Sequence, residues 1–219
     1  MAKTTYANLP INHSEVPIRL FKSDFLEFFT HIHPAVVLLL YVPVVLGLLG
    51  SAIMPRVAAS ESIAPVVLAY VMGLGVWTLT EYLLHRFVFH YEPTWPWLQR
   101  VWYLIHGVHH EQPQCKTRLV MPPILSIPLA FLFYSLFRGV VGGFLGLPQW
   151  TGSTFAGFLT GYLMYDMLHY AEHHLSMKWG FLKFIKIYHL KHHYKNPNNG
   201  FGVSSPLWDY VFRTRPKDS

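Results

Sequence analysis

The chain contains a single cysteine, Cys115, and few charged residues. One cysteine excludes an internal disulfide and any cysteine-rich metal site, so a bound metal would have to use histidine, helped at most by Asp or Glu. Charged residues make up only 13% of the 219 residues and hydrophobic residues 52%, with a mean hydropathy of +0.28. A soluble domain carries about 25% charged residues. The composition therefore indicates a membrane protein, and the length fits one domain.

Four long apolar runs have no ionisable residue in their middle, with the exception of Arg138. Each run is long enough to cross about 30 Å of hydrocarbon as a helix. The runs are residues 34–54, 64–84, 119–146 and 152–170. We therefore predict an all-α integral membrane protein with four transmembrane helices arranged as two hairpins, 34–84 and 119–170.

Basic residues are concentrated in the three segments outside the predicted hairpins, which are 1–33, 85–118 and 171–219. Together these segments hold fifteen of the 17 Lys and Arg residues, Lys3 among them. With four spans the three segments lie on one side of the membrane, and the positive-inside rule makes that side cytoplasmic. Topology and anionic headgroups then explain the net charge of +6, and no nucleic-acid partner is expected.

Both termini are expected on the cytoplasmic side, of the endoplasmic reticulum in a eukaryote or of the inner membrane in a bacterium. Residues 21–29 have the apolar spacing of a short amphipathic helix. That helix either lies on the membrane surface or packs on the protein itself. Segment 171–219 is expected to form a cytoplasmic helical cap.

Eleven of the 14 histidines follow residue 84, and ten of these form four clusters at or just past the cytoplasmic ends of predicted spans. The clusters are His85 and His90; His106, His109 and His110; His169 and His173; and His189, His192 and His193. Two of the clusters are H-x-x-H-H triplets, and positions i, i+3 and i+4 share one face of a helix. We therefore expect the three imidazoles of a triplet to point the same way. Imidazole is the commonest metal-binding side chain, so convergence of the clusters predicts a metal site.

Ten histidines exceed the ligands of one ion, roughly four to six, and fit two ions. An all-imidazole site suits Fe, Zn or Cu rather than Mg or Ca. Two metals with exchangeable positions favour oxygen chemistry or hydrolysis, and spacing does not separate these. His13, His31 and His33 lie outside the pattern and are expected to be structural. His174 need not point where His173 points, because adjacent helical residues diverge by about 100°.

The four clusters resemble the histidine boxes of the membrane fatty acid hydroxylase and sterol desaturase superfamily. Three further stretches, 81–90, 118–123 and 200–209, make residues 70–212 similar to the fatty acid 2-hydroxylases of sphingolipid synthesis. The resemblance implies a di-iron centre, held by the ten box histidines, that activates O2. It also implies hydroxylation at C2 of a long acyl chain, on a free fatty acid or within a ceramide.

The resemblance further implies that Tyr162, Tyr165 and Asp166, near His169, orient ligands or the substrate headgroup. Several relatives carry an N-terminal cytochrome b5-like domain, for which 33 leading residues are too few. Electrons are therefore expected from a separate cytochrome b5-like or ferredoxin-like protein on the cytoplasmic face. Zinc is expected to compete with iron in purified protein, because affinity at imidazole sites generally favours Zn over Fe(II).

Glu81 and Asp166 stand near the ends of predicted spans, where an unpaired charge is costly. We expect both to form hydrogen bonds that orient ligand histidines, and pairing of Glu81 with a nearby Arg is the alternative. The aromatic stretch 208–212 either caps the cavity or anchors the chain at the membrane.

Two other functions remain as alternatives. The boxes alone are shared with sterol or carotenoid oxygenases and desaturases of the same superfamily. A membrane metal transporter would need polar residues through the middle of several spans, and only Arg138 occupies such a position.

Overall fold

The structure is a computed structural model that describes residues 9–216. The first eight residues of segment 1–33, Lys3 among them, and the last three of segment 171–219 lie outside the described residues. Across 9–216 every regular element is a helix, so the predicted all-α class is confirmed. These residues divide into two compact units.

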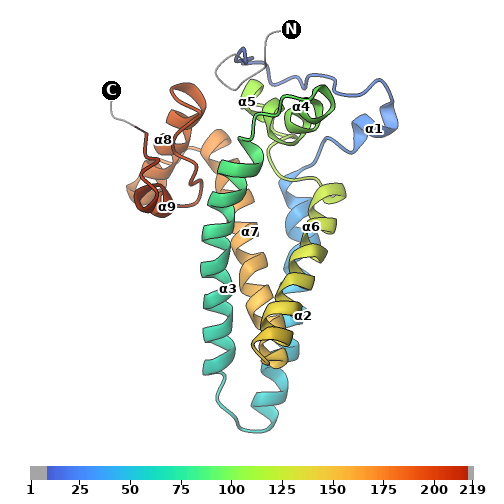
Figure 1. Cartoon of the computed structure of the whole chain (residues 1–219), viewed down its shortest axis with the longest axis vertical. Coiled ribbons are helices and arrows are strands. Elements are labelled where there is room, and N and C mark those ends of the chain that lie inside the picture. Colours follow the sequence, from blue (N-terminus) through green and yellow to red (C-terminus); the bar gives the residue numbers. More distant parts are fainter. Residues whose placement is uncertain (1–8, 217–219) are drawn as a thin grey trace. The chain divides into compact units, whose positions relative to one another are not determined.

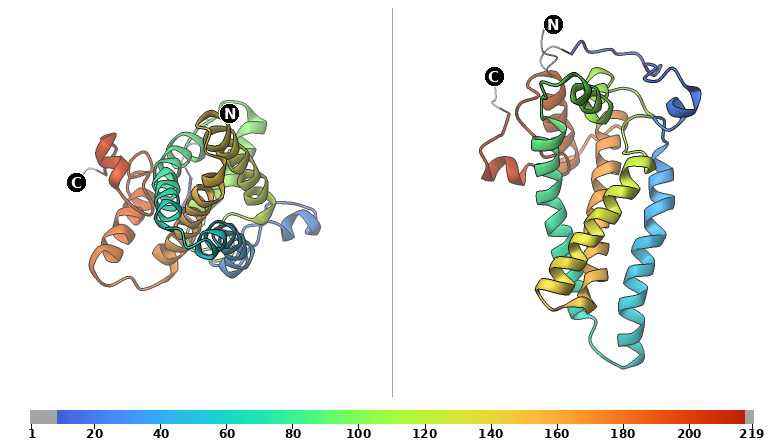
Figure 2. Two further views of the ribbon diagram at one scale, coloured as in Figure 1. Left: turned by 90° about the horizontal axis from the view of Figure 1, so that it is seen from below. Right: turned by 45° about the vertical axis from the view of Figure 1, so that its right-hand side comes forward.

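One unit, called here the membrane-helix unit, contains residues 34–79 and 121–164. Its helical segments run alongside one another (Figures 1 and 2). They are α2 (Pro34–Ala58), most of α3 (Ala64–Leu83), α6 (Pro123–Phe137) with its π-helical continuation η4 (Arg138–Phe144), the short 3-10 turn η5 (Pro148–Trp150), and the first part of α7 (Thr151–His174). Both α3 and α7 begin in this unit and end in the other.

Three helical runs among the described residues are long and apolar enough to cross a membrane, namely Pro34–Ala58, Ala64–Phe89 and Pro123–Phe144. They coincide with three of the four predicted spans. The fourth predicted span, 152–170, lies within α7 and is not among them, since polar residues such as Ser153 and Thr154 dilute its apolar character. The arrangement of four spans in two hairpins therefore stays a prediction.

Glycines allow α3 and α7 to pack with their backbones in close contact. A Cβ atom on Gly73 of α3 would lie 1.8 Å from the Thr154 carbonyl oxygen, and one on Gly157 of α7 would lie 1.9 Å from that of Tyr70. Small residues are typical of membrane helix interfaces because they let backbones approach. Substitution at either glycine would therefore force these two helices apart.

The other unit, called here the histidine-rich unit, contains residues 80–120 and 165–216 together with the described part of the N-terminal segment. Its remaining elements are α1 (Asp24–Phe28), the π-helix η2 (Leu84–Phe89), α4 (Pro96–Trp102), the π-helix η3 (Tyr103–Gly107), α5 (Val108–Glu111), α8 (Gly180–Tyr194) and α9 (Leu207–Val211). All ten clustered histidines belong to this unit.

Polar side chains attach the N-terminal segment to the rest of the histidine-rich unit. The buried Gln112 amide donates to the Val16 carbonyl at 2.7 Å and accepts from the Ile18 N–H at 2.9 Å. The buried Arg118 guanidinium donates to Glu27, and His31 contacts Thr117 at 2.9 Å. The helix predicted at 21–29 is present as the shorter α1, and it lies within this anchored stretch, since Glu27 belongs to it.

Candidate metal centre

Ten histidines come together as two groups of five. Within each group, one ligand nitrogen from every residue lies within 4.8 Å of those of the other four. The first group is His85, His90, His106, His110 and His192, and the second group is His109, His169, His173, His189 and His193. These are the ten histidines that the sequence singles out. His13, His31, His33 and His174 belong to neither group.

Each H-x-x-H-H triplet divides between the two groups. The i and i+4 members of the first triplet, His106 and His110, join the first group, while the i+3 member, His109, joins the second. The second triplet divides in the mirror sense, and its i+3 member, His192, joins the first group. The expectation that all three imidazoles point one way is therefore too simple. Positions i+3 and i+4 diverge by about 100° around a helix, so their imidazoles can belong to two different histidine groups.

The two groups are built alike, and they lie against each other. Each takes two histidines from the end of a long helix, two from one triplet and one from the other triplet. The rings of His110 and His193, which belong to different groups, stack with their centroids 4.1 Å apart. The arrangement thus offers two adjacent ion sites rather than one.

Pi-helical turns place two of the clusters. His85 and His90 are five residues apart, a spacing that on an α-helix would turn the side chains about 140° from each other. Here η2 widens the turn, the His90 N–H bonds to the His85 carbonyl at 3.0 Å, and the two ring centroids lie 4.9 Å apart. His106 lies in the second π-turn, η3. Such π-bulges occur often at functional sites.

The distances between imidazole nitrogens fit ligands around a common ion. The Nε2 atoms are 3.1 Å apart for His85 and His106, and 3.0 Å apart for His173 and His189. Ligands about 2.1 Å from a metal and at right angles to one another would be about 3.0 Å apart. Each group therefore has the spacing of a coordination sphere.

Burial keeps the imidazoles neutral, which is the form that binds metal. Burial, followed by the charge of His192, lowers the pKa of His109 to about 3, and burial lowers the pKa of His192 to about 4. In the second group, the Nε2 atoms of His109, His169 and His193 are buried and have no hydrogen-bond partner among residues 9–216. Unsatisfied buried nitrogens are costly, and an ion bound to them would remove that cost. An all-imidazole set suits Fe, Zn or Cu, so the residues present fit the iron that the resemblance implies.

Backbone carbonyls of one loop, residues 199–204, orient histidines of the first group. The Nδ1 atom of His85 lies 2.6 Å from the Phe201 carbonyl oxygen, and that of His192 lies 2.8 Å from the Asn199 carbonyl oxygen. A carbonyl can only accept, so each Nδ1 carries the proton and each Nε2 keeps its lone pair for a metal.

Two buried carboxylates hold this loop in place. Asp209 accepts from the N–H groups of Phe201 at 3.0 Å and Gly202 at 2.7 Å, and Glu81 accepts from the Val203 N–H at 2.9 Å. A Cβ on Gly202 would meet the Ser205 carbonyl oxygen at 2.1 Å, so this tight turn requires glycine. Glu81 thus acts on the site through the loop. Sequence reasoning missed the role of Asp209, and its only signal was its place in the 200–209 motif.

The predicted catalytic residues are placed as follows. The Tyr165 ring lies 5.6 Å from the His169 ring, and Asp166 is buried three residues before His169. Tyr162 lies in the membrane-helix unit, where its ring contacts Trp77 at 5.6 Å. Their roles stay predictions.

Glu172 is a further buried acid that the sequence did not indicate. It is fully buried between the ligand candidates His169 and His173 along α7, and within the described part of the chain neither carboxylate oxygen has a hydrogen-bond partner. In the sequence Glu172 resembles an ordinary charged residue near a helix end, so nothing there predicts its burial beside the histidines.

Comparisons with known proteins agree with this site. A family model described as fatty acid hydroxylase matches residues 70–214. A dihydroceramide fatty acyl 2-hydroxylase of Arabidopsis thaliana is 38% identical over 211 residues, which cover 96% of this chain and 85% of that protein. A fatty acid 2-hydroxylase of Rattus norvegicus is 38% identical over 90% of this chain and 56% of its own length. A solved structure described as full-length scs7p, with only the hydroxylase domain visible, has a TM-score of 0.79 and 38% identity, covering 89% of this chain and 70% of that chain.

Proposed function

The chain belongs to the fatty acid hydroxylase family, and from that premise we propose that it hydroxylates C2 of long-chain fatty acyl groups. The acyl group is carried by a free fatty acid or by a ceramide. The observation that carries the proposal is the pair of five-histidine groups in a chain that is similar to a dihydroceramide fatty acyl 2-hydroxylase over 96% of its length.

The first and second groups each hold one iron ion in this proposal, with the ten histidines as ligands. Iron bound there supplies the oxidising power that cleaves an unactivated C–H bond with O2. Each group would offer its ion five imidazole nitrogens, a ligand type that suits iron. Zinc is expected to compete for the same nitrogens, because affinity generally favours Zn over Fe(II).

The protein's own residues position the centre and keep it dry. Nine-tenths or more of each side chain is buried for His85, His106 and His109, which limits access of water to the ligands. The loop 199–204 fixes the tautomer and ring orientation of two ligands through its carbonyl groups. We assign Tyr162, Tyr165 and Asp166 to orienting ligands or the substrate headgroup, as the resemblance implies.

The reaction needs electrons from another protein. Insertion of one oxygen atom into a C–H bond reduces the other oxygen atom of O2 to water, which consumes an electron pair and two protons. We propose a cytochrome b5-like or ferredoxin-like donor on the cytoplasmic side, and four membrane spans that put the ends of the chain on that side. The basic segments that flank the predicted hairpins support this orientation.

Lipid mass spectrometry of cells that express the chain tests the proposal. The host should lack 2-hydroxy acyl lipids and contain a cytochrome b5 and its reductase. We expect 2-hydroxy fatty acids and 2-hydroxy ceramides to appear with the wild-type chain and with the control His13→Ala, and not with His109→Ala. A host that gains no 2-hydroxy lipid, or gains an oxygenated sterol or carotenoid instead, would contradict the proposal.

A further inference from the structure

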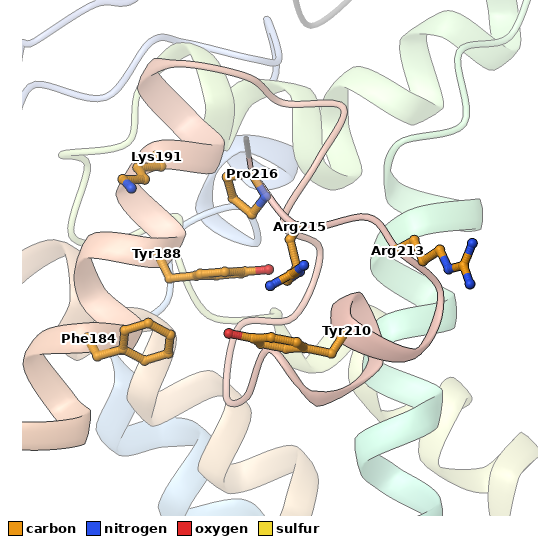
Figure 3. A pocket seen from close by; sticks show the side chains of 7 residues that line it. All are labelled: Phe184, Tyr188, Lys191, Tyr210, Arg213, Arg215 and Pro216. Carbon is orange, nitrogen blue, oxygen red and sulfur yellow. The ribbon is translucent and has the colours of Figure 1, made fainter. Parts of the chain in front are cut away.

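A pocket of about 700 Å³ lies in the histidine-rich unit between α8, α9 and the residues that follow α9 (Figure 3). Aromatic and cationic side chains line it in equal number, together with one proline. They are Phe184, Tyr188, Lys191, Tyr210, Arg213, Arg215 and Pro216. The pocket contains none of the clustered histidines, so it is separate from the candidate metal centre.

Arg215 lies at the middle of this pocket. Its guanidinium stands over the Tyr210 ring, 4.4 Å from the centroid. Figure 3 shows the Tyr188 hydroxyl pointing toward Arg215 from the α8 side, while Tyr210 projects from α9. Lys191 and Arg213 stand at the rim with their charged ends directed outward in Figure 3, and their long flexible stems allow both to reach a ligand.

The surroundings of the pocket favour an anion. Residues 171–216 contain seven Lys and Arg residues and only two acids, Glu172 and Asp209. Both acids are fully buried, and the seven cations of this stretch outnumber them. A ligand that enters the pocket therefore meets positive charge.

The backbone that carries Arg215 is fixed before any ligand binds. Thr214, the preceding residue, donates from its hydroxyl to the Asp209 carboxylate at 2.7 Å, and its carbonyl accepts from the Gly200 N–H at 2.7 Å. Arg213 adopts a left-handed conformation, with φ of 57°, that turns the chain at this point. A site that is already ordered loses less entropy when it binds a ligand.

We propose that this pocket binds a phosphate group that is attached to a larger organic molecule. Guanidinium and ammonium groups are the side chains that bind phosphate oxygens. The pocket volume of about 700 Å³ is several times what a bare phosphate needs, since one water molecule in the liquid occupies roughly 30 Å³. The half-exposed rings of Phe184 and Tyr210 line the remaining space. An anionic phospholipid headgroup and a soluble phosphate ester share this chemistry.

The pocket and the candidate metal centre share one helix. Tyr188 and Lys191 of α8 face the pocket, and the neighbouring His189 and His192 belong to the two histidine groups. Occupation of the pocket would therefore hold α8 in place beside the centre. The binding site itself does not depend on the proposed hydroxylation.

Calorimetric titration of the purified full chain in an uncharged detergent tests the proposal. The probes are dioctanoyl phosphatidic acid, inorganic phosphate and dioctanoyl phosphatidylcholine, which has no net charge because its choline cation neutralises the phosphodiester. We expect saturable binding of phosphatidic acid at one site and no saturable binding of phosphatidylcholine. Inorganic phosphate should bind more weakly than phosphatidic acid because it fills only part of the pocket, and equally tight binding would contradict an organic ligand. Glycerol 3-phosphate, added as a fourth probe, separates the two sources: binding as tight as that of phosphatidic acid would assign the pocket to soluble phosphate esters, and weaker binding to a lipid headgroup.

Variants show whether the binding occurs in this pocket. Arg215→Gln and Lys191→Gln should each weaken phosphatidic acid binding by about tenfold, because each removes a charge-assisted contact. Lys183→Gln, an exposed position on α8 outside the pocket, is the matched control and should leave binding unchanged. Equal losses in all three variants, or no saturable binding to the wild-type chain, would overturn the proposal.

Discussion

His109 and His192 each belong to the group that contains the other two histidines of the opposite H-x-x-H-H triplet. Each is the i+3 member of its triplet, so the segment that carries the triplet contributes histidines to both groups. Loss of either imidazole leaves four histidines in one group and five in the other. The two substitutions should thus affect different ions.

We predict that His109→Ala depletes the second group and that His192→Ala depletes the first. Each variant should keep about one of two ions, and its activity should fall by more than about 100-fold. Loss of a hydrogen-bond partner of a ligand costs up to about 100-fold, and loss of the ligand itself should cost more. Metal analysis by mass spectrometry and a hydroxylation assay measure this. The double variant should lose both ions, and a single variant that keeps two ions would remove its histidine from the ligand set.

Asp209 influences the first group without being part of it. Its carboxylate holds the backbone of Phe201 and Gly202, and the Phe201 carbonyl accepts from His85. Replacing the carboxylate with an amide puts an N–H₂ group against backbone N–H donors. We predict that Asp209→Asn lowers the free energy of unfolding by about 1–3 kcal/mol and weakens metal binding at the first group by about 10- to 100-fold.

Metal titration and thermal unfolding of Asp209→Asn check this prediction. Asp24→Asn is the control, since the Asp24 side chain is exposed and pairs with Arg19 at the surface. Exposed ion pairs contribute only about 0–1 kcal/mol. If Asp209→Asn lowers the unfolding temperature but leaves the metal affinity of the first group unchanged, then Asp209 only stabilises the fold. That outcome would contradict a role in positioning the first group.

The helices themselves were largely predictable from long apolar runs. Predicted spans 34–54 and 64–84 correspond to α2 (Pro34–Ala58) and α3 (Ala64–Leu83). Their ends depend on capping and packing, and α2 continues to Ala58 past an internal proline. The π-turns η2 and η3 were not predictable, since a π-turn differs from an α-turn by one inserted residue that has no compositional signature.

The π-turn at η2 makes the His85–His90 spacing equivalent to an α-helical i, i+4 pair such as His169–His173. Removal of one residue from a π-turn restores the α-helical pitch. We predict that deletion of Val88, half-exposed within η2, keeps the first ion. Deletion of Tyr170 from α7 should instead turn His173 by about 100° and lose the second ion.

Metal content of the two deletion variants, compared with that of the wild-type chain, measures the difference. Circular dichroism should give the same helical content for both, which excludes general misfolding as the cause. Loss of the first ion from the Val88 deletion would mean that η2 provides more than the spacing of its two histidines.

The histidine side chains that come together were predictable from the sequence, and the backbone carbonyl groups that hold them were not. Four clusters at helix ends, carried by separate segments, pointed to one site, and they meet in the histidine-rich unit. The carbonyl groups of Asn199 and Phe201 carry no sequence signal, because every residue has one. Their role follows only from how the chain folds back after α8.

Metal removal should affect the two compact units differently. All ten clustered histidines lie in the histidine-rich unit, and metal binding stabilises the folded state that presents its ligands. The membrane-helix unit contains none of them and is held by apolar packing and by the close contact of α3 with α7. We predict that chelation increases hydrogen exchange in residues 84–111 and 180–204 and leaves exchange in residues 36–56 unchanged.

Hydrogen-exchange mass spectrometry of the full chain, before and after chelation, tests this prediction. Fe(II) or Zn added back should restore protection in residues 84–111 and 180–204, and Mg should not, because an all-imidazole set binds hard oxygen-preferring cations weakly. Without metal, the buried imidazoles keep nitrogens that lack hydrogen bonds within residues 9–216, which is costly. Protection from hydrogen exchange should therefore be lost first at the histidine triplets. A uniform increase along the whole chain would instead mean that the metals stabilise both units together.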